Sequence, residues 1–149
     1  MSLSRISKEK NLEAFLDLRL PGTKFVIGNG PYKETLEKKY RGAAVFLDDH
    51  HVRAVLSTGD VFVFPSRFDT FGLTNLEALA CGLPIAAYPV MGPLDIIEQG
   101  ICGYTSENLQ EAALACLDLK KEACIHRASQ YSWNRTAQSF LENQLHLKS

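Results

Sequence analysis

The chain has 149 residues, of which 46% are hydrophobic and 22% charged, and its formal net charge is −1. These values are ordinary for one soluble globular domain, and we take residues 1–149 as that domain. The near-zero net charge argues against binding of nucleic acid or of an anionic membrane, and no apolar run approaches the roughly 20 residues that span a bilayer. The first five residues lack the apolar core of a secretory signal, so we expect a cytoplasmic protein.

Short apolar runs alternate with helical patterns along the chain. The apolar runs predict strands at 24–28, 44–47, 61–64, 84–88 and 103–105, the last at a sheet edge. The patterns between them predict helices at 33–41, 51–58, 94–99, 109–119, 121–130 and 132–145, and one that opens at Phe71. The run 61–64 is apolar on both faces, which is typical of a parallel strand buried on both sides. The alternation predicts a Rossmann-like α/β fold, a doubly wound parallel sheet with helices on both faces.

The four cysteines show no C-x-x-C pairing and no histidine at zinc-ligand spacing. Cys81, Cys102, Cys116 and Cys124 lie among small and apolar residues. We therefore expect reduced cysteines that pack as small apolar side chains.

The segment from Phe62 to Tyr88 is the most informative part of the sequence. It predicts a buried strand, a polar loop, a helix, a tight turn and a second buried strand, with Asp69 and Glu77 bracketing the helix start. Open α/β sheets bind ligands at the carboxyl ends of their strands, and a helix N-terminus there suits a phosphate. Two other interpretations stay open: Thr74 and Glu77 match a capping box, and Asp69 alone is also typical of a turn.

Four blocks of sequence together resemble the donor-binding C-terminal domain of the retaining glycosyltransferases of family 4, which have the GT-B fold. The acidic-x7-Glu segment is the first, within the stretch from Asp60 to Tyr88. The others are an Arg-x4-Lys loop from Arg5 to Asn11, a Gly-Asn-Gly-Pro turn at 28–31, and the Tyr-Ser-Trp at 131–133. The blocks keep the family's order and cover nearly the whole chain.

The resemblance implies a role for each matching residue in holding a nucleoside diphosphate sugar. Asp69 and Glu77 would be the catalytic pair, with Asp69 on the sugar hydroxyls and Glu77 on the ribose diol. The remaining implied roles are diphosphate binding by Arg5, Lys10, Gly72 and Leu73, sugar binding by Phe71 and Gly72 beside Asp69, and base binding at Leu47. The family implies no metal and no other cofactor. The parent reaction would move a hexose to a hydroxyl acceptor with retention of configuration.

The chain departs from the family pattern in three places. Asp69 stands where the family usually has Glu, and the loop from Asp48 to Arg53 is shorter than usual. The N-terminal acceptor domain of a GT-B enzyme has no counterpart here, so the expected partner is that domain, in a longer polypeptide or a separate chain, and this chain alone is expected to be inactive. Membrane association of the full enzyme stays open. The alternatives are a non-catalytic nucleotide-sugar-binding or interaction module and a fragment of a sugar-nucleotide epimerase.

The predicted C-terminal helix, 132–145, carries an apolar stripe that includes Trp133, Phe140 and Leu141. This stripe must fold onto the domain, pair with another chain or stay partly exposed.

Overall fold

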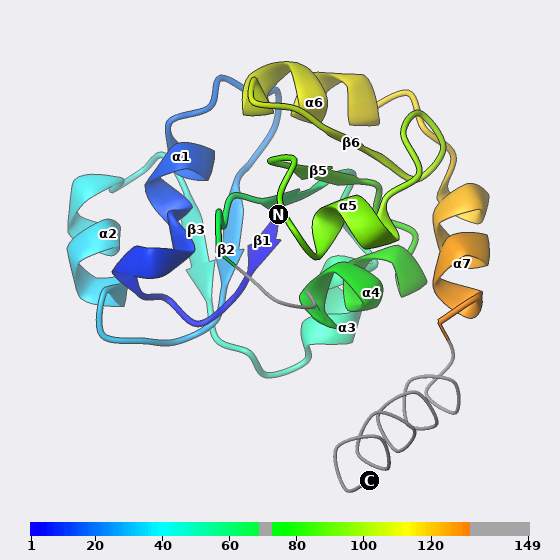
Figure 1. Cartoon of the computed structure of the whole chain (residues 1–149). Coiled ribbons are helices and arrows are strands. Elements are labelled where there is room, and N and C mark those ends of the chain that lie inside the picture. Colours follow the sequence, from blue (N-terminus) through cyan, green and yellow to red (C-terminus); the bar gives the residue numbers. More distant parts are fainter. Residues whose placement is uncertain (69–72, 132–149) are drawn as a thin grey trace, which may run out of the picture.

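Parallel strands form the centre of the molecule. The computed structural model describes residues 1–68 and 73–131 (Figure 1). The strands are β1 (Ser2–Leu3), β2 (Phe25–Ile27), β3 (Val45–Leu47), β4 (Phe62–Phe64), β5 (Ile85–Ala87) and β6 (Gly103–Thr105). They form two three-stranded parallel sheets, in the orders β1-β2-β3 and β4-β5-β6.

The backbone of Met1 joins the two sheets. Its nitrogen donates to the Val61 carbonyl at 2.7 Å, and its carbonyl accepts from the Val63 amide at 2.7 Å. This is the hydrogen-bond pattern of a parallel pair. The strands therefore run side by side in the order β3-β2-β1-β4-β5-β6, and all their carboxyl ends lie along one edge.

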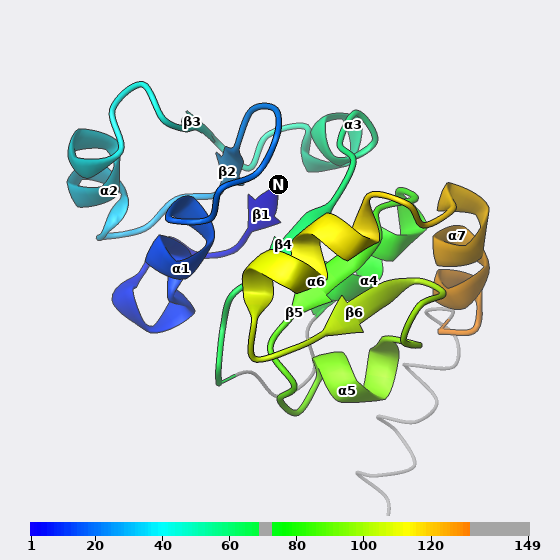
Figure 2. The ribbon, with the colours of Figure 1, turned by 90° about the horizontal axis from the view of Figure 1, so that it is seen from above.

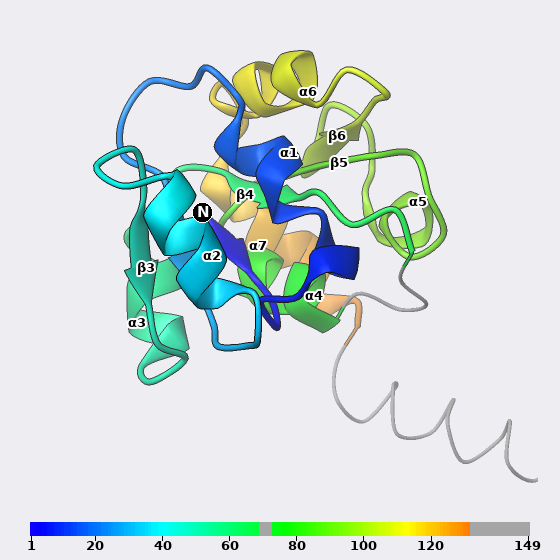
Figure 3. The same ribbon diagram turned by 90° about the vertical axis from the view of Figure 1, so that its left-hand side faces the viewer.

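Helices cover both faces of this combined sheet (Figures 1 and 3). They are a 3-10 helix (Lys8–Lys10), α1 (Leu12–Leu16), α2 (Lys33–Lys39), α3 (Val52–Leu56), α4 (Leu73–Ala80), α5 (Pro93–Ile96), α6 (Leu109–Cys116) and α7 (Lys121–Ser129). One apolar core joins residues of α1, α2 and α6 to the strands, and a second joins residues of α3, α4, α5 and α7. Figure 2 shows α6 crossing the strands on one of these faces.

Strand β4 and its neighbour Val61 show why both faces are apolar. Phe62 and Phe64 belong to the core under α3 and α4, whereas Val61 and Val63 belong to the core under α1 and α6. Successive side chains of a strand point to opposite faces, so a strand between two helical layers must be apolar throughout. The predicted doubly wound parallel sheet is thus confirmed.

The predicted elements agree with the structure except near the N-terminus. Every strand and helix predicted between residues 24 and 130 is present, with ends that differ by a few residues. Strand β1, the 3-10 helix and α1 were not predicted, because runs of two to five residues are too short to show a period. The helix predicted at 132–145 lies outside the described residues.

All four cysteines are free, as predicted. Burial raises the pKa of the Cys116 thiol to about 12 and that of Cys124 to about 11, so both stay protonated near neutral pH. Cys81 is the one that is not fully buried. Among the described residues, no helix has both the length and the apolar character needed to cross a membrane.

Candidate functional site

The Arg5–Asn11 block and the Gly28–Pro31 turn are joined directly by backbone hydrogen bonds. The Ile6 amide donates to the Asn29 carbonyl at 2.9 Å, and the Tyr32 amide donates to the Ile6 carbonyl at 3.0 Å. Each block follows its strand, β1 or β2, at the carboxyl edge of the sheet. Two motifs that are separate in the sequence are therefore one structural unit at this edge.

The two glycines of the turn make this close approach possible. A Cβ atom on Gly28, whose φ is +140°, would lie 1.9 Å from the Ser4 carbonyl oxygen, and one on Gly30 would lie 2.2 Å from that of Ile6. No side chain fits at such distances. The Gly-x-Gly spacing thus follows from the backbone contact with the segment that carries Arg5.

A side-chain contact ties the first block to the loop that follows β4. The Asn11 amide nitrogen donates to the Pro65 carbonyl at 3.0 Å. Arg5 is exposed, and Lys10 is half-buried at the end of the 3-10 helix. The structure therefore places the two predicted cationic diphosphate ligands, Arg5 and Lys10, on a segment that is fixed to the turn after β2 on one side and to the 65–68 loop on the other.

Not all the predicted site residues fall within the described structure. Asp69, Phe71 and Gly72 lie outside the described residues, so their predicted roles stay predictions. Leu47 is the half-buried last residue of β3, at the same edge of the sheet. Among residues 1–68 and 73–131, no group of three or more His, Cys, Asp or Glu residues is arranged to hold a metal ion.

Glu77 lies one turn into α4 and is exposed. It lines a cavity of about 440 Å³ together with Arg53 of α3. Thr74 is the second residue of α4, not the residue before it, so the structure does not support the capping box in which Thr74 precedes the helix. The carboxylate of Glu77 is accordingly accessible to a ligand.

Sequence reasoning missed Arg67, which links the ends of three adjacent strands. Its guanidinium carbon lies 3.8 Å from the centroid of the Tyr88 ring, which follows β5. Its Nη1 atom lies 3.2 Å from a carboxylate oxygen of Glu107, which follows β6. The stacking and ion pair fix the start of the loop after β4. Only its place, two residues before Asp69, marks Arg67 in the sequence.

Asn75 of α4 is completely buried, and among the residues that the structure describes neither polar atom of its side-chain amide has a hydrogen-bond partner. A buried amide without partners lowers stability. We therefore expect Asn75→Leu to raise the free energy of unfolding by about 1–3 kcal/mol in urea denaturation. Asn11→Leu is the matched control and should lower it, because the Asn11 amide donates to Pro65. A less stable Asn75→Leu protein would contradict the prediction.

The fold and the joined motifs define a Rossmann-like α/β domain whose motifs meet where open parallel sheets bind ligands. The sequence matches the family described as "Glycosyl transferases group 1" over residues 3–121. The chain therefore belongs to this family, whose members have the GT-B fold, and covers roughly one half of GT-B structures.

Similarity to individual proteins supports the same family assignment. The chain is 42% identical to the sulfoquinovosyl transferase of Arabidopsis thaliana over 110 residues, 69% of this chain and 22% of that protein. It is 30% identical to a GDP-mannose-dependent phosphatidylinositol dimannoside mannosyltransferase of Mycobacterium tuberculosis, over 92% of this chain and 41% of that one. The structure resembles Anabaena HepE in complex with UDP with a TM-score of 0.73 at 19% identity, over 97% of this chain and 47% of HepE. The chain thus spans less than half the length of these relatives.

Proposed function

We propose that this chain is the half of a retaining glycosyltransferase that binds the nucleoside diphosphate sugar. One observation carries the proposal: the Arg5 block, the glycine turn and the loop before α4 are held together at the carboxyl edge of the sheet by the bonds of Ile6, Tyr32 and Asn11. The family match adds support, and it favours a transferase over an epimerase. Solved structures of HepE contain UDP or UDP-glucose, which is consistent with a nucleotide-sugar ligand.

In this proposal each group has a task suited to its chemistry. The cations of Arg5 and Lys10 hold the diphosphate and stabilise the leaving nucleoside diphosphate, and the backbone amides at the start of α4, near Leu73, share that work. The ionised carboxylate of Glu77 accepts both ribose hydroxyls. Asp69 and Phe71 hold the sugar, and the backbone at Leu47 receives the base. The identity of the base stays open, because one relative is a GDP-mannose-dependent mannosyltransferase whereas HepE has been solved in complex with UDP-glucose.

The proposal assigns acceptor binding and closure of the active site to a second half, in the same polypeptide or a separate chain. Its support is that the chain spans 41% of the mannosyltransferase and 47% of HepE. Closure around both substrates orients them and excludes water. We therefore expect this chain to bind the donor without transferring the sugar.

Ligand-observed NMR against UDP, GDP, ADP and their sugars tests the proposal. We expect one nucleotide to bind, and Arg5→Ala or Glu77→Gln to weaken it about tenfold to a hundredfold, because each loses a charge-assisted contact of about 1.5–3 kcal/mol. Arg41→Ala and Glu111→Gln are matched controls: both side chains are exposed, and Arg41 lies in the loop before β3, at the amino edge of the sheet.

Binding of no nucleotide by a folded sample would overturn the proposal and leave an interaction module. If Arg5→Ala and Arg41→Ala lowered the nucleotide affinity equally, the binding would reflect general electrostatic attraction and not a defined site. Transfer of sugar by the isolated chain would overturn the assignment of the acceptor to a second half.

A further inference from the structure

Tyr32 directly follows the Gly28–Pro31 turn and contacts the Arg5–Asn11 block at two points. Its backbone amide donates to the Ile6 carbonyl at 3.0 Å, and the Lys8 ammonium lies over its ring, 5.7 Å from the centroid. Ile6 is near the start of the block, and Lys8 is the first residue of its 3-10 helix. An aromatic face attracts a cation, so both contacts hold the block against Tyr32.

The hydroxyl of Tyr32 makes a third contact, with α1, which follows the block. It donates to Glu13 Oε1 at 2.6 Å, and Oε2 of the same carboxylate accepts from Lys39 of α2 at 3.0 Å. The hydrogen bond from Tyr32 and then that from Lys39 lower the pKa of Glu13, and the bond to Glu13 raises the pKa of Tyr32. Near neutral pH the phenol is therefore protonated and donates to an ionised carboxylate, which is a strong type of hydrogen bond.

We propose that Tyr32 is a positioning residue, which holds the Arg5–Asn11 block in one arrangement between the turn after β2 and α1. The block needs such support, because a three-residue 3-10 helix has poor hydrogen-bond geometry of its own. Cations that are already in place bind an anion without the further cost of ordering them. That this arrangement serves a diphosphate rests on the proposed function, whereas the support of the block by Tyr32 does not.

Tyr40 offers a matched control at the other ends of the same two helices. It follows the last residue of α2, and its hydroxyl donates to Oδ1 of Asp17, which follows the last residue of α1, at 2.7 Å. Helices α1 and α2 lie side by side (Figures 2 and 3). Tyr40→Phe therefore removes the same kind of contact, a phenol that donates to a carboxylate, from the same pair of helices but away from the block.

Amide hydrogen exchange, measured for each residue by NMR without any ligand, tests the support of the block. The backbone amides of Lys10 and Asn11 donate to carbonyls within the block. Tyr32→Phe should speed their exchange about threefold to tenfold, because the block opens more often once one hydrogen bond is lost. Tyr40→Phe should leave their exchange at the wild-type rate. Adding Tyr32→Phe to Glu13→Leu should speed it no further, since both changes remove the same hydrogen bond.

Ligand-observed NMR then tests what the arrangement is for. With whichever of UDP, GDP and ADP binds, Tyr32→Phe should lower the affinity about threefold to tenfold, and the affinity for the matching nucleoside monophosphate should fall less. Tyr40→Phe should change neither affinity, although both variants lose a similar hydrogen bond.

Unchanged amide exchange in Tyr32→Phe, or equally faster exchange in Tyr40→Phe, would overturn the inference. Faster exchange in Tyr32→Phe with unchanged nucleotide affinity would overturn the link between this arrangement and the diphosphate. If the wild type binds no nucleotide, the proposed function fails, and the exchange rates still decide whether Tyr32 holds the block.

Discussion

Gly28→Ala should cost on the order of 4 kcal/mol of the free energy of unfolding, a large part of the 5–15 kcal/mol typical of a domain. The added Cβ would lie 1.9 Å from the Ser4 carbonyl oxygen at a φ of +140°. Both atoms belong to backbone that is fixed in neighbouring parallel strands or their ends, so neither is free to move aside. The turn must separate from the segment that carries Arg5, and the contact that joins the two motifs is lost.

Two other glycines separate this collision from the effect of backbone conformation alone. Gly22 and Gly42 have φ values of +83° and +78°, and an added Cβ meets nothing within 4 Å at either. Alanine at these positions should cost only about 1–2 kcal/mol, the usual penalty for a left-handed residue with a side chain. Urea denaturation of the three variants measures the difference. Equal losses at all three positions would show that the contact between Gly28 and Ser4 is not tight in solution.

This comparison also shows what the sequence could predict. The strands and helices between residues 24 and 130 follow from apolar runs and helical periods, because each signal lies within one element. The contact between Gly28 and Ser4 depends on how β1 pairs with β2, and β1 has only two residues. Such a strand leaves no pattern, so the resemblance of the Gly-x-Gly turn to a known motif, and not its physics, pointed to the position.

The contacts of the candidate site were even harder to predict from the sequence. The order of the motif blocks indicated that they belong together, but nothing in the residues predicted that Asn11 would bond to Pro65, 54 positions away. The contact of Arg67 with Glu107, 40 positions away, was likewise not predicted. Contacts of this kind come from the order of strands in the sheet. Each of these residues follows a strand or a short helix, and a sheet of parallel strands brings such residues to one edge.

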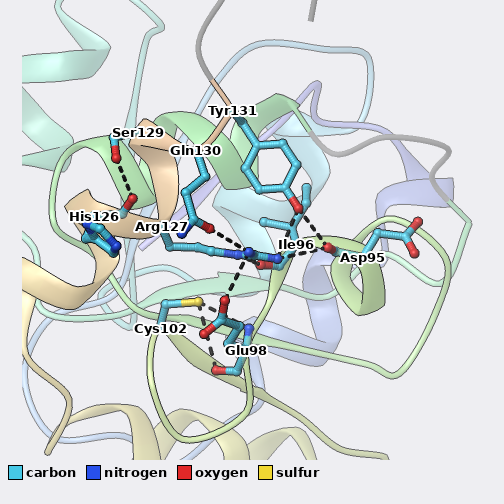
Figure 4. A network of polar contacts seen from close by, with 9 residues as sticks. All are labelled: Asp95, Ile96, Glu98, Cys102, His126, Arg127, Ser129, Gln130 and Tyr131. Carbon is cyan, nitrogen blue, oxygen red and sulfur yellow. Dashed lines mark hydrogen bonds and ion pairs between the residues drawn. The ribbon is translucent and has the colours of Figure 1, made fainter. Parts of the chain in front are cut away.

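Replacing Arg127 should cause the second large loss of stability, because its partly buried guanidinium holds α7 to α5 (Figure 4). Arg127→Met removes hydrogen bonds to two backbone carbonyls and leaves Glu98 without its ion-pair partner. The two carbonyls lose a charged donor, so we expect the free energy of unfolding to fall by about 2–4 kcal/mol. Methionine keeps most of the apolar stem, which limits the loss from packing.

Smaller changes to the same hydrogen-bond network should lower the free energy of unfolding by smaller amounts. Arg127→Lys keeps the charge but has no planar fork to reach both carbonyls, so its loss should be intermediate. Tyr131→Phe removes the hydroxyl that bonds to the Asp95 carbonyl and should cost about 0.5–1.5 kcal/mol. Lys38→Met is the control for charge removal, because the Lys38–Glu34 pair is exposed and worth at most about 0.5 kcal/mol.

Urea denaturation measures the free energy of unfolding of each variant. If the Arg127→Met protein were as stable as the Lys38→Met protein, α7 would be held by its apolar contacts alone.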